Sequence, residues 1–333
     1  MEHNRRARPT LRLLAEDLPT GWEDPDHLRA IAERRWQQLH PVAELPHPLL
    51  RKAVELYGSD PLGDPAPRLI KSSGELRLQE LRNAQWRAGI WTDPDSGVRW
   101  ILSAGLAKGG HRDEDDFYQV LERRIGSGAT ALLPTEHDVL LLKRETAAAA
   151  LTRWHLTLQS EVAQALDRLG KAASTRIALP HPSKPIAIGT VDIELDVVRE
   201  DGTPREDFFL TVDLRSEHQV STWGWRAIER VLISIAPPVQ DWDRHGNHYF
   251  VMAEPGHRSR QYNRLVAVGG RDETLFAEHG TVSHYTHRSH IAEASVDGKA
   301  VRAMCGVVFV PTRDPDRLTV CPRCAENFAA LPG

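Results

Sequence analysis

The stretch HDVLLLKRETAAAALTRWHLTLQSEVAQALDRLG, residues 137–170, is the longest helix candidate in the chain. It contains four consecutive alanines, Ala147 to Ala150, and alanine has the highest intrinsic helix propensity. It ends at Gly170, and glycine commonly terminates a helix. We expect a helix of this length to connect two domains. The alternative, which the sequence leaves open, is a helix that packs entirely within one of them.

The chain before this helix changes from a helical pattern to a strand-rich one. Residues 24–40 and 46–58 carry apolar side chains at helical spacing. Between residues 76 and 107, three short runs rich in Trp, Ile, Leu and Val are separated by turns. A charged helix is expected over residues 113–126. Residues 1–130 are therefore predicted to form an α+β domain with helices on an antiparallel sheet.

The chain after the long helix is strand-rich again, and residues 173–270 are predicted to form a second, β-rich domain. Between residues 185 and 215, apolar and polar residues alternate on both sides of an Asp-Gly turn, as in an antiparallel hairpin. Asp192, Glu194 and Asp196 share one face of the first strand, which is compatible with a metal-dependent nuclease. The preferred alternative is the solvated face of the hairpin, because no lysine motif of the nuclease kind is nearby.

All three cysteines lie in the last 29 residues. Cys321 and Cys324 form a Cys-Pro-Arg-Cys motif, whose spacing lets two thiolates reach one tetrahedral ion from a tight turn. Cys305 offers a third thiolate, and the fourth ligand must be a histidine or a carboxylate because no cysteine is left. Four histidines lie upstream: His279, His284, His287 and His290. We prefer His284 and predict a structural zinc site; a redox motif or a chance Cys-x-x-Cys is the alternative.

The C-terminal motifs occur in a characteristic order. His284-Tyr285 is followed by GKAVRAMCG, which ends at Cys305-Gly306, then by a turn from Val310 to Pro315, and then by Cys321-Pro-x-Cys324. This order resembles a small bacterial zinc-ribbon-like family that is known only as a domain of unknown function. The resemblance covers roughly 50 residues. It implies that residues 275–333 form a separate zinc-ribbon module, and it implies no activity.

The strand-rich part of the N-terminal domain is basic, although the chain has a formal net charge of −4. Between Arg68 and Arg112, eight basic residues stand against four acidic ones, a local net charge of +4. Trp86, Trp91 and Trp100 are interleaved with these cations. Cations beside aromatic rings are typical of surfaces that bind single-stranded RNA. A solvated sheet face above a tryptophan-rich core is the alternative.

The same segment contains a leucine-arginine strand, an aromatic-arginine strand, a turn and an apolar strand ending in lysine. These are Glu80-Leu81-Arg82, Trp86-Arg87, Asp93 to Gly97, and Trp100 to Lys108. In this order they resemble the RelE-type and HigB-type toxins, small ribonucleases with helices on an antiparallel sheet. The resemblance covers roughly residues 10–125. It implies RNA binding, or RNA cleavage in which the 2′-hydroxyl attacks the adjacent phosphate while cations stabilise the developing charge.

The resemblance also implies roles for individual residues. Arg87 matches the arginine of the aromatic-arginine strand and would stabilise the transition state. Arg82 and Lys108 would hold phosphates, and Lys71 and Arg77 are also expected to bind RNA. His111 is a candidate general acid or base because it lies close to Lys108 in the sequence and because histidine is the residue type that most often has this role.

Composition and missing motifs exclude several other classes of function. Three cysteines are too few for a disulfide scaffold, and no apolar run approaches the roughly 18 residues of a membrane span. The N-terminus has no apolar stretch typical of a signal peptide, so a cytoplasmic location is expected. The sequence contains no Walker A motif, no GxSxG elbow and no HExxH, which removes support for an NTPase, an α/β-hydrolase and a zincin.

The sequence therefore predicts an RNA- or ribosome-engaging protein with a structural zinc module. If the protein is an enzyme, we expect a metal-independent endoribonuclease of the toxin or defence kind. The alternative is a non-enzymatic adaptor, in which the middle domain or the zinc ribbon binds a protein partner.

Overall fold

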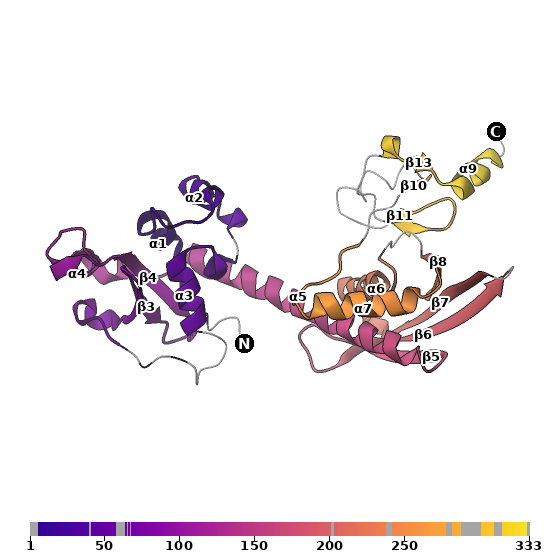
Figure 1. The fold of residues 1–333 in the computed structure, drawn as a ribbon, viewed down its shortest axis with the longest axis horizontal. Coiled ribbons are helices and arrows are strands. Elements are labelled where there is room, and N and C mark those ends of the chain that lie inside the picture. Colours follow the sequence, from indigo (N-terminus) through magenta and orange to yellow (C-terminus); the bar gives the residue numbers. More distant parts are fainter. Residues whose placement is uncertain are drawn as a thin grey trace. The chain divides into compact units, whose positions relative to one another are not determined.

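The computed structural model describes residues 6–39, 41–57, 64, 66, 68–200, 203–237, 242–277, 282–287, 301–309 and 315–331. The chain divides into two compact units, Met1–Ala149 and Ala150–Gly333, which we call unit 1 and unit 2. The boundary falls within the predicted long helix, α5 (Glu136–Arg168) (Figure 1). Each unit combines helices with a sheet whose strands are mainly antiparallel.

Unit 1 contains a four-stranded sheet in the order β1-β4-β3-β2. Its strands are β1 (Arg8–Pro9), β2 (Gln79–Asn83), β3 (Trp86–Thr92) and β4 (Arg99–Leu106). The three later strands are antiparallel neighbours, as expected. β1 was not foreseen and runs parallel to β4, so the sheet is not wholly antiparallel. A strand of two residues is too short to show the alternation by which strands are found in a sequence.

The helices of unit 1 are α1 (Leu11–Glu16), α2 (Pro25–Ala32), α3 (Pro48–Leu56) and α4 (Phe117–Gly128). The helical pattern predicted over residues 24–40 breaks after α2, where Arg34 adopts a left-handed backbone with a φ of 55°. The charged helix predicted over residues 113–126 begins later than expected, at Phe117. The reason is Asp116, whose carboxylate caps the helix by accepting a hydrogen bond from the backbone N–H of Tyr118 at 2.9 Å.

Two apolar cores lie on opposite faces of the unit 1 sheet. Ile101 of β4 belongs to the core that α1 and α3 share, whereas its neighbours Trp100 and Leu102 belong to a second core with Phe117 of α4. This division follows from the alternation of side chains along a strand. The sheet is therefore covered on both faces.

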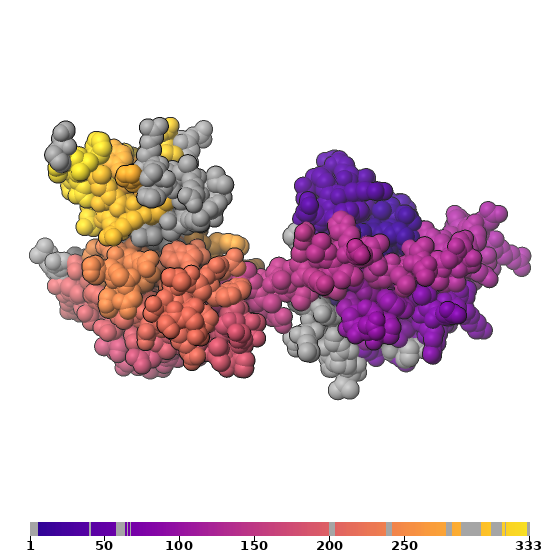
Figure 2. Space-filling view, turned by 180° about the vertical axis from the view of Figure 1, so that it is seen from behind, coloured from indigo at the N-terminus to yellow at the C-terminus, as the bar shows by residue number. Residues whose placement is uncertain are grey.

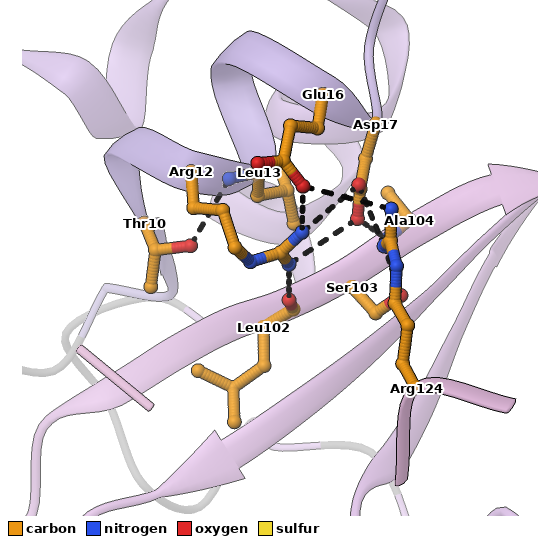
Figure 3. Close-up of polar contacts among 9 residues, drawn as sticks. All are labelled: Thr10, Arg12, Leu13, Glu16, Asp17, Leu102, Ser103, Ala104 and Arg124. Carbon is orange, nitrogen blue, oxygen red and sulfur yellow. Dashed lines mark hydrogen bonds and ion pairs between the residues drawn. The ribbon is translucent and has the colours of Figure 1, made fainter. Parts of the chain in front are cut away.

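Asp17, which follows α1, is a buried carboxylate that joins α1 to β4 and α4 (Figure 3). It accepts hydrogen bonds from the backbone N–H of Ala104 at 2.9 Å and from the Arg124 guanidinium at 2.7 Å. Arg12 donates to the same carboxylate at 3.2 Å and also to the carbonyl oxygen of Leu102. Because an unpaired buried charge is strongly unfavourable, this cluster holds three elements of unit 1 together.

Unit 2 contains a five-stranded antiparallel sheet in the order β5-β6-β7-β9-β8. Its strands are β5 (Ser174–Pro180), β6 (Ala187–Glu200), β7 (Thr203–Leu214), β8 (Asp243–His245) and β9 (His248–Ala253). The C-terminal part of α5, α6 (Thr222–Ile235) and α7 (His257–Gly269) share one apolar core with this sheet. The sheet therefore has a helix-covered face and an outer face. α7 was not foreseen, because Leu265 is its one buried apolar side chain.

The predicted hairpin of unit 2 is formed by β6 and β7. Glu194 and Asp196 are exposed, and Asp192 forms an ion pair with Arg176 of β5 at 2.6 Å. Among the residues that the structure describes, these acids belong to no cluster that could hold a metal ion. This arrangement supports the solvated hairpin rather than the metal-dependent nuclease.

The C-terminal module of unit 2 has little regular structure. In the described part, β10 (Val282–Ser283) pairs with β13 (Thr319–Val320), β11 (Val301–Arg302) pairs with β12 (Val308–Phe309), and α9 (Pro322–Ala329) follows. A bridge between Val307 and Asp243 links the module to β8, and Figure 2 shows the module in yellow against the orange part of unit 2. The division of unit 2 into a middle domain and a zinc ribbon stays a prediction.

The middle of α5, from residue 143 to residue 150, contributes no side chain to the apolar cores. Leu141 and Leu142 belong to the cores of unit 1, and Trp154 and Leu158 belong to the core of unit 2. No side chain between residues 143 and 153 is buried. The alanines at its centre therefore supply helix propensity where packing supplies little. No helix in the described part of the chain combines the length and the apolar character needed to span a membrane.

Candidate functional site

The backbone of the C-terminal module brings together four side chains that could hold a metal ion: His284, Cys305, Cys321 and Cys324. His284 follows β10 and Cys321 follows its partner β13, and the Cys321 N–H donates to the carbonyl oxygen of Ser283 at 2.8 Å. Cys305 lies in the turn between β11 and β12. Cys324 lies in the first turn of α9. Two short strand pairs and the first turn of α9 thus position the four ligands.

The donor atoms of these residues are close enough to surround a single ion. All four lie within 4.8 Å of one another. The Nδ1 atom of His284 is 3.3 Å from the Cys305 sulfur and 3.7 Å from the Cys324 sulfur. His287, a possible fourth ligand in the sequence, does not belong to this cluster. His279 and His290 lie outside the described residues.

The cluster is largely buried, with His284 half-buried. Cys324 is fully buried, and the three cysteines form a small apolar core with Ala303. Burial raises the pKa of the Cys305 thiol to about 11, and the neighbouring thiols of Cys324 and Cys321 act in the same direction. Burial also lowers the pKa of His284, which favours the neutral imidazole. A bound cation would stabilise the thiolates that burial disfavours.

Comparison with known proteins places this segment in context. Residues 277–331 match a family described as a protein of unknown function, DUF3039. The DUF3039 match includes all four candidate ligands and leaves unit 1 and most of unit 2 uncovered. The predicted resemblance of the C-terminal residues to a domain of unknown function is thereby confirmed. Neither a curated protein nor a solved structure matches the chain.

A second group of polar side chains surrounds Tyr118 of α4 in unit 1. The Tyr118 hydroxyl donates to Glu80 of β2, which also forms an ion pair with Arg82 at 2.7 Å. Arg87 lies directly opposite Arg82 on β3. The His111 ring meets the Tyr118 ring edge-on, with centroids 4.7 Å apart. The structure thus brings three predicted RNA-contacting residues, Arg82, Arg87 and His111, to one place, which we call the Tyr118 cluster.

Within the Tyr118 cluster, the pKa of Glu80 is lowered and the pKa of Tyr118 is raised. Burial raises the pKa of Tyr118 and the hydrogen bond to Glu80 adds to this, whereas Arg87 and Arg82 act in the opposite direction. For Glu80, burial alone would raise the pKa, but Tyr118, Arg82 and Arg68 together bring it below its usual value. At neutral pH the cluster therefore holds a carboxylate, a neutral phenol and two guanidinium groups.

Lys108 is linked to the Tyr118 cluster by Asp116, which contacts both Lys108 and His111. Asp116 accepts hydrogen bonds from the Lys108 backbone N–H at 2.7 Å and from Nδ1 of His111 at 3.0 Å. The Lys108 ammonium group pairs with Asp115 and lies 3.6 Å from Asp113. In the described structure, no hydrogen bond or ion pair joins Lys71 or Arg77 to this cluster; both are exposed and precede β2.

The three tryptophans of the basic segment face the cores of unit 1. Trp100 is buried, and Trp86 and Trp91 pack against the two cores. The structure therefore supports the tryptophan-rich core for these residues, and they offer no exposed stack for RNA bases.

Sequence reasoning missed Tyr118 and Glu80. A signal for Glu80 was present, because Glu80 and Arg82 are two residues apart on a strand and so share a face. No comparable signal pointed to Tyr118, which reaches the sheet only through the packing of α4.

Proposed function

We propose that the protein binds RNA, that the Tyr118 cluster of unit 1 contacts the phosphate chain, and that a structural zinc ion stabilises the C-terminal module. The observation that carries the proposal is the convergence of Arg82, Arg87 and His111 on Tyr118. Guanidinium groups bind phosphate in a bidentate manner, and a phenol and an imidazole beside them can exchange protons. The four acidic residues 113–116 offset the positive charge of the neighbouring basic segment. Recognition of RNA would therefore depend on the arrangement of the Tyr118 cluster rather than on the net charge of unit 1.

Zinc is the metal that best fits the donors of the C-terminal module. Three thiolates and one imidazole form a closed tetrahedral set typical of structural zinc. Bond lengths for zinc separate sulfur and nitrogen donors by about 3.5 Å and sulfur donors by about 3.8 Å. The distances from His284 Nδ1 to Cys305 and Cys324, 3.3 and 3.7 Å, are close to these values. With four protein ligands, the ion would have no open position for catalysis.

The Tyr118 cluster has the groups needed for RNA cleavage without a metal. A base would accept the proton of the 2′-hydroxyl as its oxygen attacks the adjacent phosphorus, and an acid would protonate the departing 5′-oxygen. His111 is placed to accept a proton, and Tyr118, whose raised pKa keeps it protonated, to donate one. Arg82 and Arg87 would stabilise the charge that develops on the phosphate. Cleavage is the stronger form of the proposal.

RNA binding is expected to weaken in Arg87→Ala, because the variant loses a phosphate contact. The expected loss is roughly 10-fold in affinity, and the dependence of log affinity on log salt should become shallower by about 0.7 for a single strand. Fluorescence anisotropy with a labelled single-stranded RNA, at several salt concentrations, measures both. Arg29→Ala removes an exposed arginine of α2 and serves as the matched control.

Incubating the same protein preparations with RNA and analysing the products distinguishes RNA cleavage from RNA binding. If the protein cleaves RNA, products should accumulate with the wild type and disappear in Tyr118→Phe, whereas a binding protein should leave the RNA intact. Equal RNA affinity of the wild type and Arg87→Ala would contradict the role of the Tyr118 cluster.

One observation favours the alternative function, a non-enzymatic adaptor. Exposed apolar side chains gather on the C-terminal module, where Tyr285 contacts Phe328 with ring centroids 5.0 Å apart and Met304 donates its N–H to the Tyr285 carbonyl oxygen. Exposed apolar patches often mark protein interfaces. Absence of RNA binding by the wild type would favour this function over the proposed one.

A further inference from the structure

A cavity of about 420 Å³ lies between the unit 2 sheet and the C-terminal module. Its volume is within the range of ligand pockets, about 300–1,000 Å³. The sheet contributes residues of β7, β8 and β9, and the module contributes Arg302, Gly306 and Arg323. This cavity is separate from the Tyr118 cluster, which belongs to unit 1.

The sheet side of the cavity presents aromatic and imidazole rings on the outer face of the sheet. Phe209 of β7 is paired with Phe250 of β9, and their ring centroids are 4.8 Å apart. In the next row on the same face, Thr211 is paired with His248, which is paired with His245 of β8. Phe209 is 40% exposed, although it lies within a strand. Phe250 is half-buried, so the exposed ring of Phe209 and the adjoining ring of Phe250 form a surface on which a planar base can stack.

The module side of the cavity presents two cations. Arg302 of β11 and Arg323 of α9 are exposed. Among the described residues, no carboxylate forms an ion pair with either. Asp243 is the one carboxylate in the described lining. Both arginines are therefore available to an anion, in contrast to Arg82 and Lys108 of unit 1, which are paired with acids.

Arg244 also borders the cavity, but its guanidinium is engaged by other groups of the protein. Its position alternates with Asp243 and His245, so its side chain projects from the opposite face of β8. There its guanidinium lies over the Tyr249 ring, 5.4 Å from the centroid. The cavity therefore has a floor of two phenylalanines, two nearby histidines, and two arginines that form no ion pair with a described carboxylate.

We infer that this cavity binds one nucleotide of a single-stranded RNA, with the base on Phe209 and Phe250 and the phosphate between Arg302 and Arg323. The inference rests on the proposed RNA binding and adds a second contact site to it. Stacking on an aromatic ring does not depend on the identity of the base, whereas the arginines require a phosphate. A phosphopeptide or a simple anion would use the arginines and leave the phenylalanines without a role.

The test measures binding of a fluorescein-labelled single-stranded RNA of about 12 nucleotides, within the usual site size, to the full-length protein. Phe209→Ala is expected to weaken binding by about 5- to 150-fold, the range found for loss of one stacked base. Arg302→Ala and Arg323→Ala are each expected to make the salt dependence shallower by about 0.7. Phe209→Leu retains an apolar side chain in the sheet and guards against a loss of packing.

Two matched controls lie in the same unit and outside the cavity: Lys184→Ala, an exposed cation before β6, and Phe276→Ala, whose ring is 82% exposed. Both should bind RNA as the wild type does. Because Arg323 lies between two candidate ligands, the zinc content of Arg323→Ala is measured and should equal that of the wild type.

Three outcomes would overturn the inference, and they are distinguishable. Wild-type affinity in all cavity variants, with weaker binding by Arg87→Ala, would overturn the cavity and leave the proposed function standing. Weaker binding by the arginine variants alone would indicate an anion site without base stacking. Failure of the wild type to bind RNA would overturn the proposed function together with this inference.

Discussion

Replacing Cys324 by serine is expected to remove the metal ion and to unfold the C-terminal module. Cys324 is fully buried, and its sulfur lies 3.7 Å from His284 Nδ1. A module this small buries little apolar surface, and structural zinc sites contribute about 10–16 kcal/mol of apparent binding free energy in zinc-finger peptides. Elemental analysis should find about one zinc ion per chain in the wild type and none in Cys324→Ser. Hydrogen exchange should show loss of protection in residues 301–309 and 315–331, with unit 1 unchanged.

Variants of His284 and His287 test the assignment of the fourth ligand and serve as a matched pair. His284→Asn should lose zinc as Cys324→Ser does, whereas His287→Asn should retain it, because His287 is outside the cluster. Zinc retained in Cys324→Ser, or lost equally from both histidine variants, would contradict the ligand assignment. Another metal in place of zinc would correct the identity of the ion and leave its ligands unchanged.

Replacing Asp17 by alanine is expected to destabilise unit 1 by about 3–5 kcal/mol, the usual range for breaking a buried ion pair by removing one partner. The variant would remove the buried carboxylate that Arg12 and Arg124 share, leaving them the exposed Glu16, and would leave the N–H of Ala104 without its acceptor. Native-state hydrogen exchange at the amides of β4 measures the free energy of opening of unit 1 separately from unit 2.

Glu16→Ala is the matched control for this prediction. Glu16 neighbours Asp17, forms an ion pair with Arg12 at 3.0 Å and has an exposed side chain. Exposed ion pairs contribute about 0–1 kcal/mol, so this variant should change the opening free energy little. If Asp17→Ala and Glu16→Ala changed the opening free energy of unit 1 by similar amounts, the buried Asp17 would not stabilise unit 1 as expected.

The elements that the sequence predicted well depend on local patterns. The hairpin of β6 and β7 follows from alternation and an Asp-Gly turn, and the Cys321/Cys324 pair follows from a fixed spacing. The choice of His284 required more, because four histidines were available and only backbone pairing brings this one to the cysteines.

The elements that the sequence did not predict depend on contacts between distant segments. The segment with a local charge of +4 ends at Arg112. The next four residues are acidic, and three of them pair with Lys108 or His111 in the structure. The phenylalanines and arginines of the unit 2 cavity come from β7, β9, β11 and α9, so no sequence window contains them together. Burial of the tryptophans could not be predicted from composition, because the amino-acid sequence does not distinguish a buried tryptophan from an exposed one.

The backbone of His111 offers a way to study its side chain without disturbing the fold. His111 has a left-handed φ of 52° and follows Gly110, which has a φ of 80°. A left-handed conformation costs a residue other than glycine about 1–2 kcal/mol. His111→Gly would therefore relieve backbone strain while it removes the imidazole that contacts Asp116 and Tyr118. A functional defect in this one variant would report on the imidazole itself, since the turn that carries it accommodates glycine at least as well.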